Sequence, residues 1–195
     1  GGGGGGTGAV SAKHVSSVRF ASLDVSQPLK TALAKGFGYE FMTEVQAATI
    51  GPMLAGKDVV ARAKTGTGKT LAFLVPMVER LHQHPGGVGG LISALVLSPT
   101  RELAQQISGE GKVLLEYHKN LGIACFYGGT NIGGDQRTLA KQPIDILVAT
   151  PGRMQDHLDN TNGFRKRLEH LKLLVLDEAD QLLDMGFRDA ILKIL

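Results

Sequence analysis

The sequence predicts an α/β protein in which helices cover both faces of a parallel β-sheet. Short apolar runs alternate with longer segments of helical periodicity, and this alternation is typical of such a sheet. Polar residues marked by Gly or Pro follow each apolar run. Hydrophobic residues make up 43% of the 195 residues and charged residues 20%, a balance that favours one well-buried globular domain.

The amino-terminal part is predicted to contain a tail and two helices. Residues 1–6 are all glycine, and residues 1–19 show no periodicity, which predicts a loose tail. Ser26 and Pro28 predict a helix start, and Gly36 its end. A second helix is expected to begin near Thr43 and to end near Gly56, because Thr43 and Gln46 match a capping box.

Five apolar runs are predicted to be strands, and long helices are expected to follow the first two, over residues 69–81 and 101–118. The runs are residues 58–62, 93–97, 123–127, 144–149 and 171–176. Parallel strands place their carboxyl ends at one edge of a sheet, and ligands of such sheets bind at that edge. The polar segments after the five runs therefore predict one continuous functional surface.

A glycine-rich loop between the first strand and its helix predicts a phosphate-binding site. Residues 63–70 read AKTGTGKT. Gly66 and Gly68 allow successive backbone N–H groups to surround an anion, and the following helix adds the positive end of its dipole. Lys69 is then placed to reach phosphates, and the Thr70 hydroxyl to ligate Mg²⁺. The general pattern has Gly where this chain has Ala63, and the alternative is an ordinary turn with a solvated Lys69.

The fifth predicted strand runs directly into two acidic residues. Asp177 is expected to hold a metal ion opposite Lys69, and Glu178 to orient or deprotonate an attacking water. The alternative is an ordinary helix start, where acidic residues favour the helix dipole. That alternative suffices for Asp180 and Asp184.

Several other classes of site find no support in the composition. A formal charge of +3 permits nucleic-acid binding without arguing for it. The single cysteine, Cys125, excludes an internal disulfide and lies in an apolar run, which predicts a buried core thiol. No apolar stretch approaches the length of a membrane span.

Taken together, these residues resemble the DEAD-box RNA helicase family, whose name is spelled by residues 177–180. The resemblance covers residues 20–195. Residues 63–70 are similar to motif I, in which Ala is a usual first residue, and residues 99–104 to motif Ia. Gly128 and Gly129 are similar to the GG element, residues 150–153 to motif Ib, and residues 38–46 with Phe20 to the Q motif. Met42 stands where many members have Pro.

The resemblance implies a RecA-like, P-loop three-layer sandwich with a mostly parallel central sheet. Residues 20–195 would be the first RecA-like, ATP-binding domain, preceded by the tail of residues 1–19. The chain stops before the family's Ser-Ala-Thr motif, and the second RecA-like domain is absent from it. The sequences of residues 65–70, 155–158 and 183–187 resemble most the organellar, Mss116-like branch of the family. A mitochondrial or chloroplast location is therefore an expectation, with nucleus or cytoplasm as the alternative.

The resemblance also implies two ligands, Mg²⁺–ATP and RNA. Gln46 would read adenine, although its capping box explains the residue equally well. Lys69, Asp177 and Glu178 would carry catalysis, with Thr70 and Asp177 at the metal. The residues expected to bind nucleotide are Phe20, Tyr39, Gln46, Lys64, Thr65, Gly66, Thr67, Gly68, Lys69 and Thr70. Those expected to bind the RNA backbone are Pro99, Thr100, Arg101, Gly128, Gly129, Thr150, Pro151, Gly152 and Arg153. The cluster Arg165, Lys166 and Arg167 is expected to be a solvated loop.

The activity implied is ATP-dependent RNA unwinding, with this chain as the amino-terminal ATPase half. The fragment alone is expected to be monomeric and nearly inactive, without contact with membranes, and to need the second RecA-like domain as its partner. Two alternatives remain open at this point. One is a DNA-acting helicase or translocase with the same core, and the other is a scaffold that holds RNA without turning over ATP.

Overall fold

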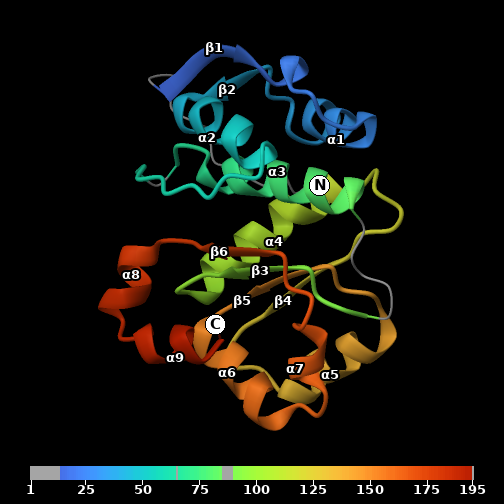
Figure 1. The fold of residues 1–195 in the computed structure, drawn as a ribbon, viewed down its shortest axis with the longest axis vertical. Helices are drawn as coiled ribbons and strands as arrows, with labels where there is room; N and C mark the ends of the chain where they lie inside the picture. Colours follow the sequence, from blue (N-terminus) through green and yellow to red (C-terminus); the bar gives the residue numbers. More distant parts are fainter. Residues whose placement is uncertain (1–13, 65, 85–89, 195) are drawn as a thin grey trace, which may run out of the picture.

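The computed structural model describes residues 14–64, 66–84 and 90–194, and its centre is a parallel four-stranded sheet. The sheet order is β4-β5-β3-β6 (Figure 1). The strands are β3 (Ala94–Leu97), β4 (Ile123–Phe126), β5 (Ile146–Ala149) and β6 (Leu173–Leu176). They correspond to four of the five predicted runs, each shorter by one or two residues.

The register brings the last residues of all four strands into line. Leu97 of β3 lies beside Ala149 of β5 on one side and Leu176 of β6 on the other, and Phe126 of β4 lies beside Ala149. The segments that follow the four strands therefore emerge at one edge of the sheet, as the sequence predicted. This common edge is called the carboxyl edge below.

Both faces of the sheet are buried, which confirms the predicted three-layer architecture. Successive strand residues point to opposite faces, so β3 and β5 each contribute to two hydrophobic clusters. One cluster contains Ala94, Val96, Ile146 and Val148 with residues from the amino-terminal helices. The other contains Leu95, Leu97, Leu147 and Ala149 with residues from the carboxyl-terminal helices.

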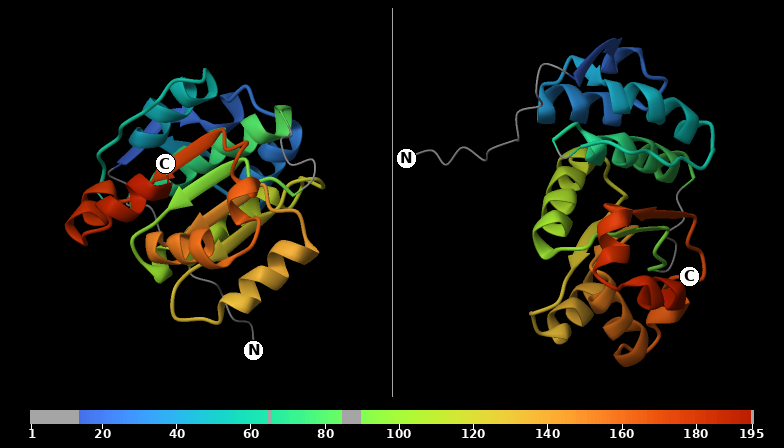
Figure 2. Two further views of the ribbon diagram at one scale, coloured as in Figure 1. Left: turned by 60° about the horizontal axis from the view of Figure 1, so that its bottom comes forward. Right: turned by 90° about the vertical axis from the view of Figure 1, so that its left-hand side faces the viewer.

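The helices divide between the two faces in chain order, as Figures 1 and 2 show. The first face is covered by α3 (Lys69–Gln83) and α4 (Arg101–Leu115). The helices α1 (Gln27–Ala32) and α2 (Glu44–Leu54) pack on the outer side of this layer, so that α3 lies between the sheet and the amino-terminal elements (Figure 1). The second face is covered by α5 (Ile132–Lys141), α6 (Pro151–Asn160), α7 (Phe164–Arg167), α8 (Ala179–Asp184) and α9 (Arg188–Ile194).

Regular secondary structure begins closer to the amino terminus than predicted. Residues of β1 (Val15–Arg19) pair antiparallel with β2 (Phe41–Thr43), so the expectation of a loose tail is wrong for this stretch. Residues 1–13 lie outside the described part. The predicted first helix is confirmed with Pro28 in its first turn. It continues as a π-helical turn over Leu33–Phe37 and ends at Gly38, whose φ is 67°.

The predicted first strand is not a strand in this structure. Residues 58–62 have no regular secondary structure, they are mostly exposed, and the Val60 side chain is fully exposed. A strand needs a neighbour for its backbone N–H and C=O groups, and no described strand lies beside this segment. The prediction of a buried strand here is therefore wrong, although the loop and helix that follow it are formed.

No helix in the described ranges has both the length and the apolar character that crossing a membrane requires.

Candidate functional site

The phosphate loop wraps the amino end of α3 in backbone conformations that suit glycine. Gly66 and Gly68 have φ angles of 78° and 88°, and Gly68 is the N-cap of α3. No side chain caps this helix end, so its first N–H groups are free to meet an anion. The buried Thr67 hydroxyl donates to the Lys64 carbonyl at 2.7 Å, which closes the loop. Thr65 lies outside the described residues.

Gln46 ties the loop to α2. The predicted capping box is confirmed: the Thr43 N–H donates to Gln46 Oε1 at 2.8 Å, and the Gln46 N–H donates to Thr43 Oγ1 at 3.3 Å. The side-chain Nε2 of Gln46 donates to the Gly68 carbonyl at 3.0 Å. A Cβ on Gly68 would lie 2.5 Å from that Nε2. The packing of Gln46 and the positive φ thus both require glycine at position 68.

Lys69 and Glu178 meet at the carboxyl edge. Lys69 Nζ lies 2.6 Å from Glu178 Oε1, and both side chains are about one-fifth exposed. Glu178 has φ 48°, and it is the one non-glycine residue in the described ranges with a left-handed backbone. Such a conformation costs about 1–3 kcal/mol and concentrates at functional sites. The sequence placed these two residues together, but nothing in it revealed the strained backbone.

Asp177 directly precedes Glu178 and is hydrogen-bonded to the last residue of β3. Its N–H donates to the Leu97 carbonyl at 2.9 Å, which continues the β6–β3 ladder by one residue. Burial and the neighbouring Glu178 carboxylate raise the pKa of Asp177, and the Lys69 ammonium opposes them. A half-buried carboxylate whose charged form is disfavoured by its surroundings is suited to receive a cation.

The donors for a hard divalent cation at this place are the Asp177 carboxylate and the Thr70 hydroxyl. Thr70 lies in the first turn of α3 directly after Lys69 and is partly exposed. No group of three or more His, Cys, Asp or Glu side chains suitable for a metal occurs among residues 14–64, 66–84 and 90–194. Mg²⁺ does not need such a group, because it keeps several waters and takes one or two protein ligands with phosphate oxygens. The residues present therefore fit Mg²⁺ bound together with a nucleotide.

The other half of the carboxyl edge holds the residues expected to bind RNA. Arg101, the first residue of α4, is exposed, and its Nη1 lies 3.1 Å from the position of a Cβ on Gly129. Thr100 caps α4 by accepting from the Leu103 N–H at 3.3 Å. Thr150 occupies the same position at α6, yet its hydroxyl makes no capping bond. The amino end of α6, with the exposed Gly152, is thus free to meet an anion.

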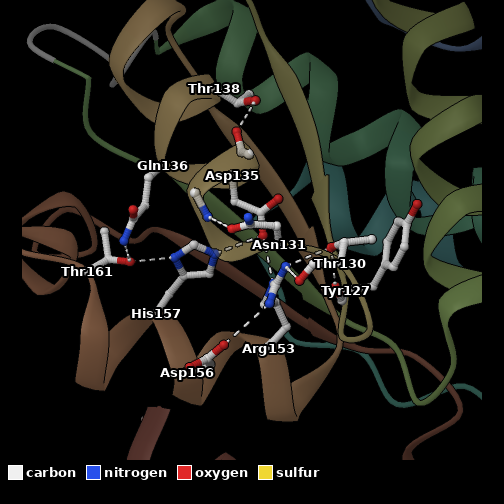
Figure 3. A network of polar contacts seen from close by, with 12 residues as sticks. Tyr127, Thr130, Asn131, Asp135, Gln136, Thr138, Arg153, Asp156, His157 and Thr161 are labelled. Carbon is white, nitrogen blue, oxygen red and sulfur yellow. Dashed lines mark hydrogen bonds and ion pairs between the residues drawn. The ribbon is translucent and has the colours of Figure 1, made fainter.

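Arg153 is not exposed in this structure. It is 6% exposed, and its guanidinium donates to Asp135, Asp156 and Thr130 (Figure 3). Its Nε lies 2.8 Å from Asp135 Oδ2, and its Nη2 lies 2.7 Å from both the carbonyl and the hydroxyl oxygen of Thr130. The family resemblance implied an arginine that contacts the RNA backbone, whereas in this structure the Arg153 guanidinium is buried and bonded to protein groups.

Asp135 and His157 belong to the same network and were missed by the sequence. His157 is fully buried between Phe126 and Phe164, with 5.0 Å between ring centroids on each side. Its Nε2 lies 3.0 Å from Asp135 Oδ2, and its Nδ1 lies 2.8 Å from Thr161 Oγ1 (Figure 3). The sequence pattern that could have predicted this network is the spacing of Arg153, His157 and Thr161 at intervals of four along α6 and the residue after it, which places them on one face. The carboxylate that completes it comes from another helix.

Three further residues named from the sequence are Phe20, Tyr39 and Cys125. Phe20 is buried in the hydrophobic core, and Tyr39 stacks on Phe37 with ring centroids 6.0 Å apart. A contact of either with a nucleotide base stays a prediction. Cys125 is partly buried rather than fully buried, and burial raises the pKa of its thiol to about 11, which disfavours a nucleophilic role. The basic cluster at residues 165–167 is the short helix α7 rather than a loop.

Comparisons with known proteins agree with the geometry. The chain is 52% identical over 188 residues to the DEAD-box ATP-dependent RNA helicase 26 of Oryza sativa subsp. japonica, covering 96% of this chain and 34% of that protein. It is 48% identical over 191 residues to the DEAD-box ATP-dependent RNA helicase 25 of Arabidopsis thaliana, covering 93% of this chain and 33% of that one. The chain therefore spans about a third of the length of these relatives.

A similar fold occurs in a solved structure described as DEAD-box helicase Mss116 bound to ssRNA and UDP-BeF. The TM-score is 0.83 with 34% identity, and the match covers 92% of this chain and 37% of that one. The model of the DEAD/DEAH box helicase family matches residues 43–195. With the phosphate loop, the Asp177–Glu178 pair and the RecA-like sheet, this match shows that the chain belongs to the DEAD/DEAH box helicase family.

Proposed function

We propose that this chain is the ATP-binding, amino-terminal RecA-like domain of an ATP-dependent RNA helicase. The observation that carries the proposal is the contact of Lys69 with Glu178 at the carboxyl edge, beside Asp177. This contact joins the start of α3 to the end of β6, 109 positions apart in the chain, and so assembles the two parts that phosphoryl transfer from Mg²⁺–ATP requires.

In the proposed nucleotide site the protein positions ATP and supplies charge. The free N–H groups at the start of α3 and the Lys69 ammonium would bind the phosphates, with Lys69 exchanging Glu178 for a phosphate oxygen. Glu178, released from that pair, would accept a proton from the attacking water. The Gln46 amide keeps one N–H and one oxygen lone pair beyond its two present side-chain bonds, which is the pattern that can donate to and accept from adenine.

Mg²⁺ would be held by Asp177 and the Thr70 hydroxyl. When bound, it would neutralise charge on the phosphate oxygens during transfer. The raised pKa of Asp177 in its absence supports this assignment, because a nearby cation would relieve the cost of keeping that carboxylate ionised.

RNA would bind along the rest of the carboxyl edge through its sugar–phosphate backbone. Arg101 offers an exposed guanidinium beside Gly129, and the uncapped amino end of α6 offers N–H groups with the Thr150 hydroxyl. Such contacts do not depend on base sequence. The comparisons support RNA, since the relatives are named RNA helicases and the solved neighbour is bound to ssRNA.

ATP turnover with and without RNA tests the proposal. The natural protein that contains residues 1–195, with its own flanking sequence, is expected to hydrolyse ATP faster when single-stranded RNA is added. Lys69→Ala and Glu178→Gln should each abolish that turnover. Unchanged turnover in both variants would contradict the proposal and favour a non-catalytic RNA scaffold. Stimulation by single-stranded DNA equal to that by RNA would favour the DNA-acting alternative.

Residues 1–195 on their own are expected to bind nucleotide weakly and to show little RNA-stimulated hydrolysis. The chain spans about a third of the length of these relatives. The family resemblance implies that a second RecA-like domain, which carries arginine fingers, is needed as a partner. Arginine fingers contribute about a thousandfold or more in phosphoryl transfer. Strong RNA-stimulated turnover by the isolated residues would contradict this expectation.

A further inference from the structure

A network of partly buried polar contacts joins the loop after β4 to helix α6 (Figure 3). The loop, residues 127–131, carries Gly129 and Thr130 and leads into α5. Asp135, in the first turn of α5, accepts from both Arg153 and His157 of α6 through the same oxygen, Oδ2. One carboxylate thus anchors two side chains that lie one helical turn apart.

Arg153 extends the network from Asp135 back to the loop. While Nε is bonded to Asp135, Nη2 donates to both the carbonyl and the hydroxyl oxygen of Thr130. The fixed fork of the guanidinium allows one side chain to satisfy both places at once. The Thr130 loop is therefore clamped onto α6, one turn from the free amino end of that helix.

A second tie holds the other end of α6. His157 is fixed between two phenylalanine rings and bonds Asp135 and Thr161, and Gln136 Nε2 of α5 donates to Thr161 Oγ1 at 3.1 Å. The neighbouring α5 residues Asp135 and Gln136 therefore bond, respectively, to residues within α6 and to Thr161, the residue that follows its end.

We propose that Asp135 is a positioning residue for RNA binding. It fixes the Thr130 loop against α6 through Arg153 and His157, so that Gly129 and the amino end of α6 face the RNA backbone as one surface. In this arrangement Arg153 acts through the loop and does not contact a phosphate. The inference rests on the proposed RNA binding at these strand ends.

Asp135→Asn separates this role from a direct contact by Arg153. The variant keeps the shape of residue 135 but removes the charge paired with Arg153 Nε, so the guanidinium is left with Thr130 and Asp156 as its partners. A direct phosphate contact then predicts equal or tighter RNA binding. Positioning predicts weaker binding, by about tenfold for a coupling of ordinary size.

The measurement is the affinity of the natural protein, with its flanking sequence, for a fluorescent single-stranded RNA over a series of salt concentrations. Positioning predicts an unchanged salt slope and an unchanged affinity for a fluorescent Mg²⁺–ATP analogue. Asp159→Asn is the matched control on α6, because Asp159 is exposed and its Arg165 partner is 3.9 Å away; it should leave RNA affinity within about twofold.

Arg153→Lys provides a second variant that keeps the positive charge but cannot reach Asp135 and Thr130 together. Positioning predicts a loss similar to that of Asp135→Asn, and a double variant no weaker than either single one. The inference is overturned if Asp135→Asn binds RNA as tightly as wild type, or if its salt slope steepens by about 0.7, the value for one added phosphate contact on a single strand.

Other outcomes separate the inference from the proposed function. A parallel loss of RNA and nucleotide affinity in both variants would show a general structural role and overturn the inference. If wild type itself fails to bind RNA, the proposed function fails together with the inference. If wild type binds RNA and both Asp135→Asn and Arg153→Lys bind it equally well, the inference is overturned while the proposed function stands.

Discussion

The charged groups at the two halves of the carboxyl edge, around the phosphate loop and around α6, differ in how fully they are paired within the protein. Around the phosphate loop, Asp177 is half-buried with a raised pKa, and Glu178 has a strained backbone. Around α6, the nearly buried Arg153 has all three of its nitrogens bonded to acceptors, and His157 has both of its ring nitrogens bonded. The acidic groups near the phosphate loop are suited to bind a ligand cation, whereas the side chains near α6 are already bonded to other protein groups. Predictions that alter one half while leaving the other intact test this difference.

The largest effect is expected for Glu178→Gln. Glutamine keeps the shape of the side chain but cannot accept a proton from water, so ATP turnover in the natural protein should fall about a hundredfold or more. Single-turnover hydrolysis measures this, and nucleotide affinity should be retained. Asp184→Asn, at the exposed end of α8, is the control and should leave turnover unchanged. A Gln variant with turnover close to wild type would remove Glu178 from the chemistry.

Gly68→Ala tests whether the loop geometry is required. The added Cβ meets Gln46 Nε2 at 2.5 Å, and the φ of 88° disfavours any L side chain. We expect the free energy of unfolding to drop by about 1–3 kcal/mol, together with a loss of nucleotide binding.

Denaturant midpoints measure the effect of Gly68→Ala, and Gly109→Ala in α4 is its control. No heavy atom outside the local helix lies within 4 Å of the position of a Cβ on Gly109. That substitution should stabilise the protein by about 0.5–1 kcal/mol. Equal midpoints for the two variants would contradict the loop geometry.

A smaller effect distinguishes the two N-cap threonines at the RNA half. Thr100→Ala removes the bond to the Leu103 N–H and should cost about 1 kcal/mol of stability. Thr150→Ala removes no capping bond, so its thermal midpoint should stay near wild type while RNA affinity falls. A loss of stability in Thr150→Ala equal to that in Thr100→Ala would show that the α6 end is not free for a ligand.

The smallest effect concerns Asp177 and pH. Because its pKa is raised in the folded state above the ordinary 3.8, the folded protein binds the proton more tightly than the unfolded chain does. The resulting stabilisation is complete below pH 3.8 and is lost as the pH rises through the folded pKa. Without Mg²⁺, Asp177→Asn should therefore be more stable than wild type at neutral pH, and the difference should shrink on acidification.

Thermal denaturation at several pH values measures this difference. Mg²⁺–ATP should stabilise wild type but not Asp177→Asn. A variant less stable than wild type at neutral pH without Mg²⁺ would contradict the stated environment of Asp177.

Much of the fold could be predicted from the sequence, because its signals are local. The four strands of the sheet are short apolar runs, and Gly66 and Gly68 of the phosphate loop stand at positions with positive φ. The segments that could not be predicted depend on partners distant in the chain. Residues 15–19 become a strand only by pairing with β2, and residues 58–62 do not become one because no described strand lies beside them.

The candidate site divides in the same way. The sequence was sufficient to place Lys69 beside the acidic pair, because the glycine-rich loop and the acidic residues are local motifs. The strand predicted before the loop, over residues 58–62, is not formed. It could not show that Arg153 is buried, because the carboxylate that holds it comes from α5, which the residue pattern did not predict. Nor could it show the backbone strain at Glu178, since no composition rule marks a glutamate for a positive φ.

Binding of a fluorescent ATP analogue with Mg²⁺ to wild type, Lys69→Ala and Lys57→Ala tests the central claim most directly. Lys57 is an exposed lysine upstream of the loop and carries the same charge. If the Lys69 ammonium binds the phosphates, Lys69→Ala should weaken the affinity by about tenfold or more, while Lys57→Ala leaves it unchanged. Equal affinities for the three proteins would contradict the assignment of the carboxyl edge as the nucleotide site.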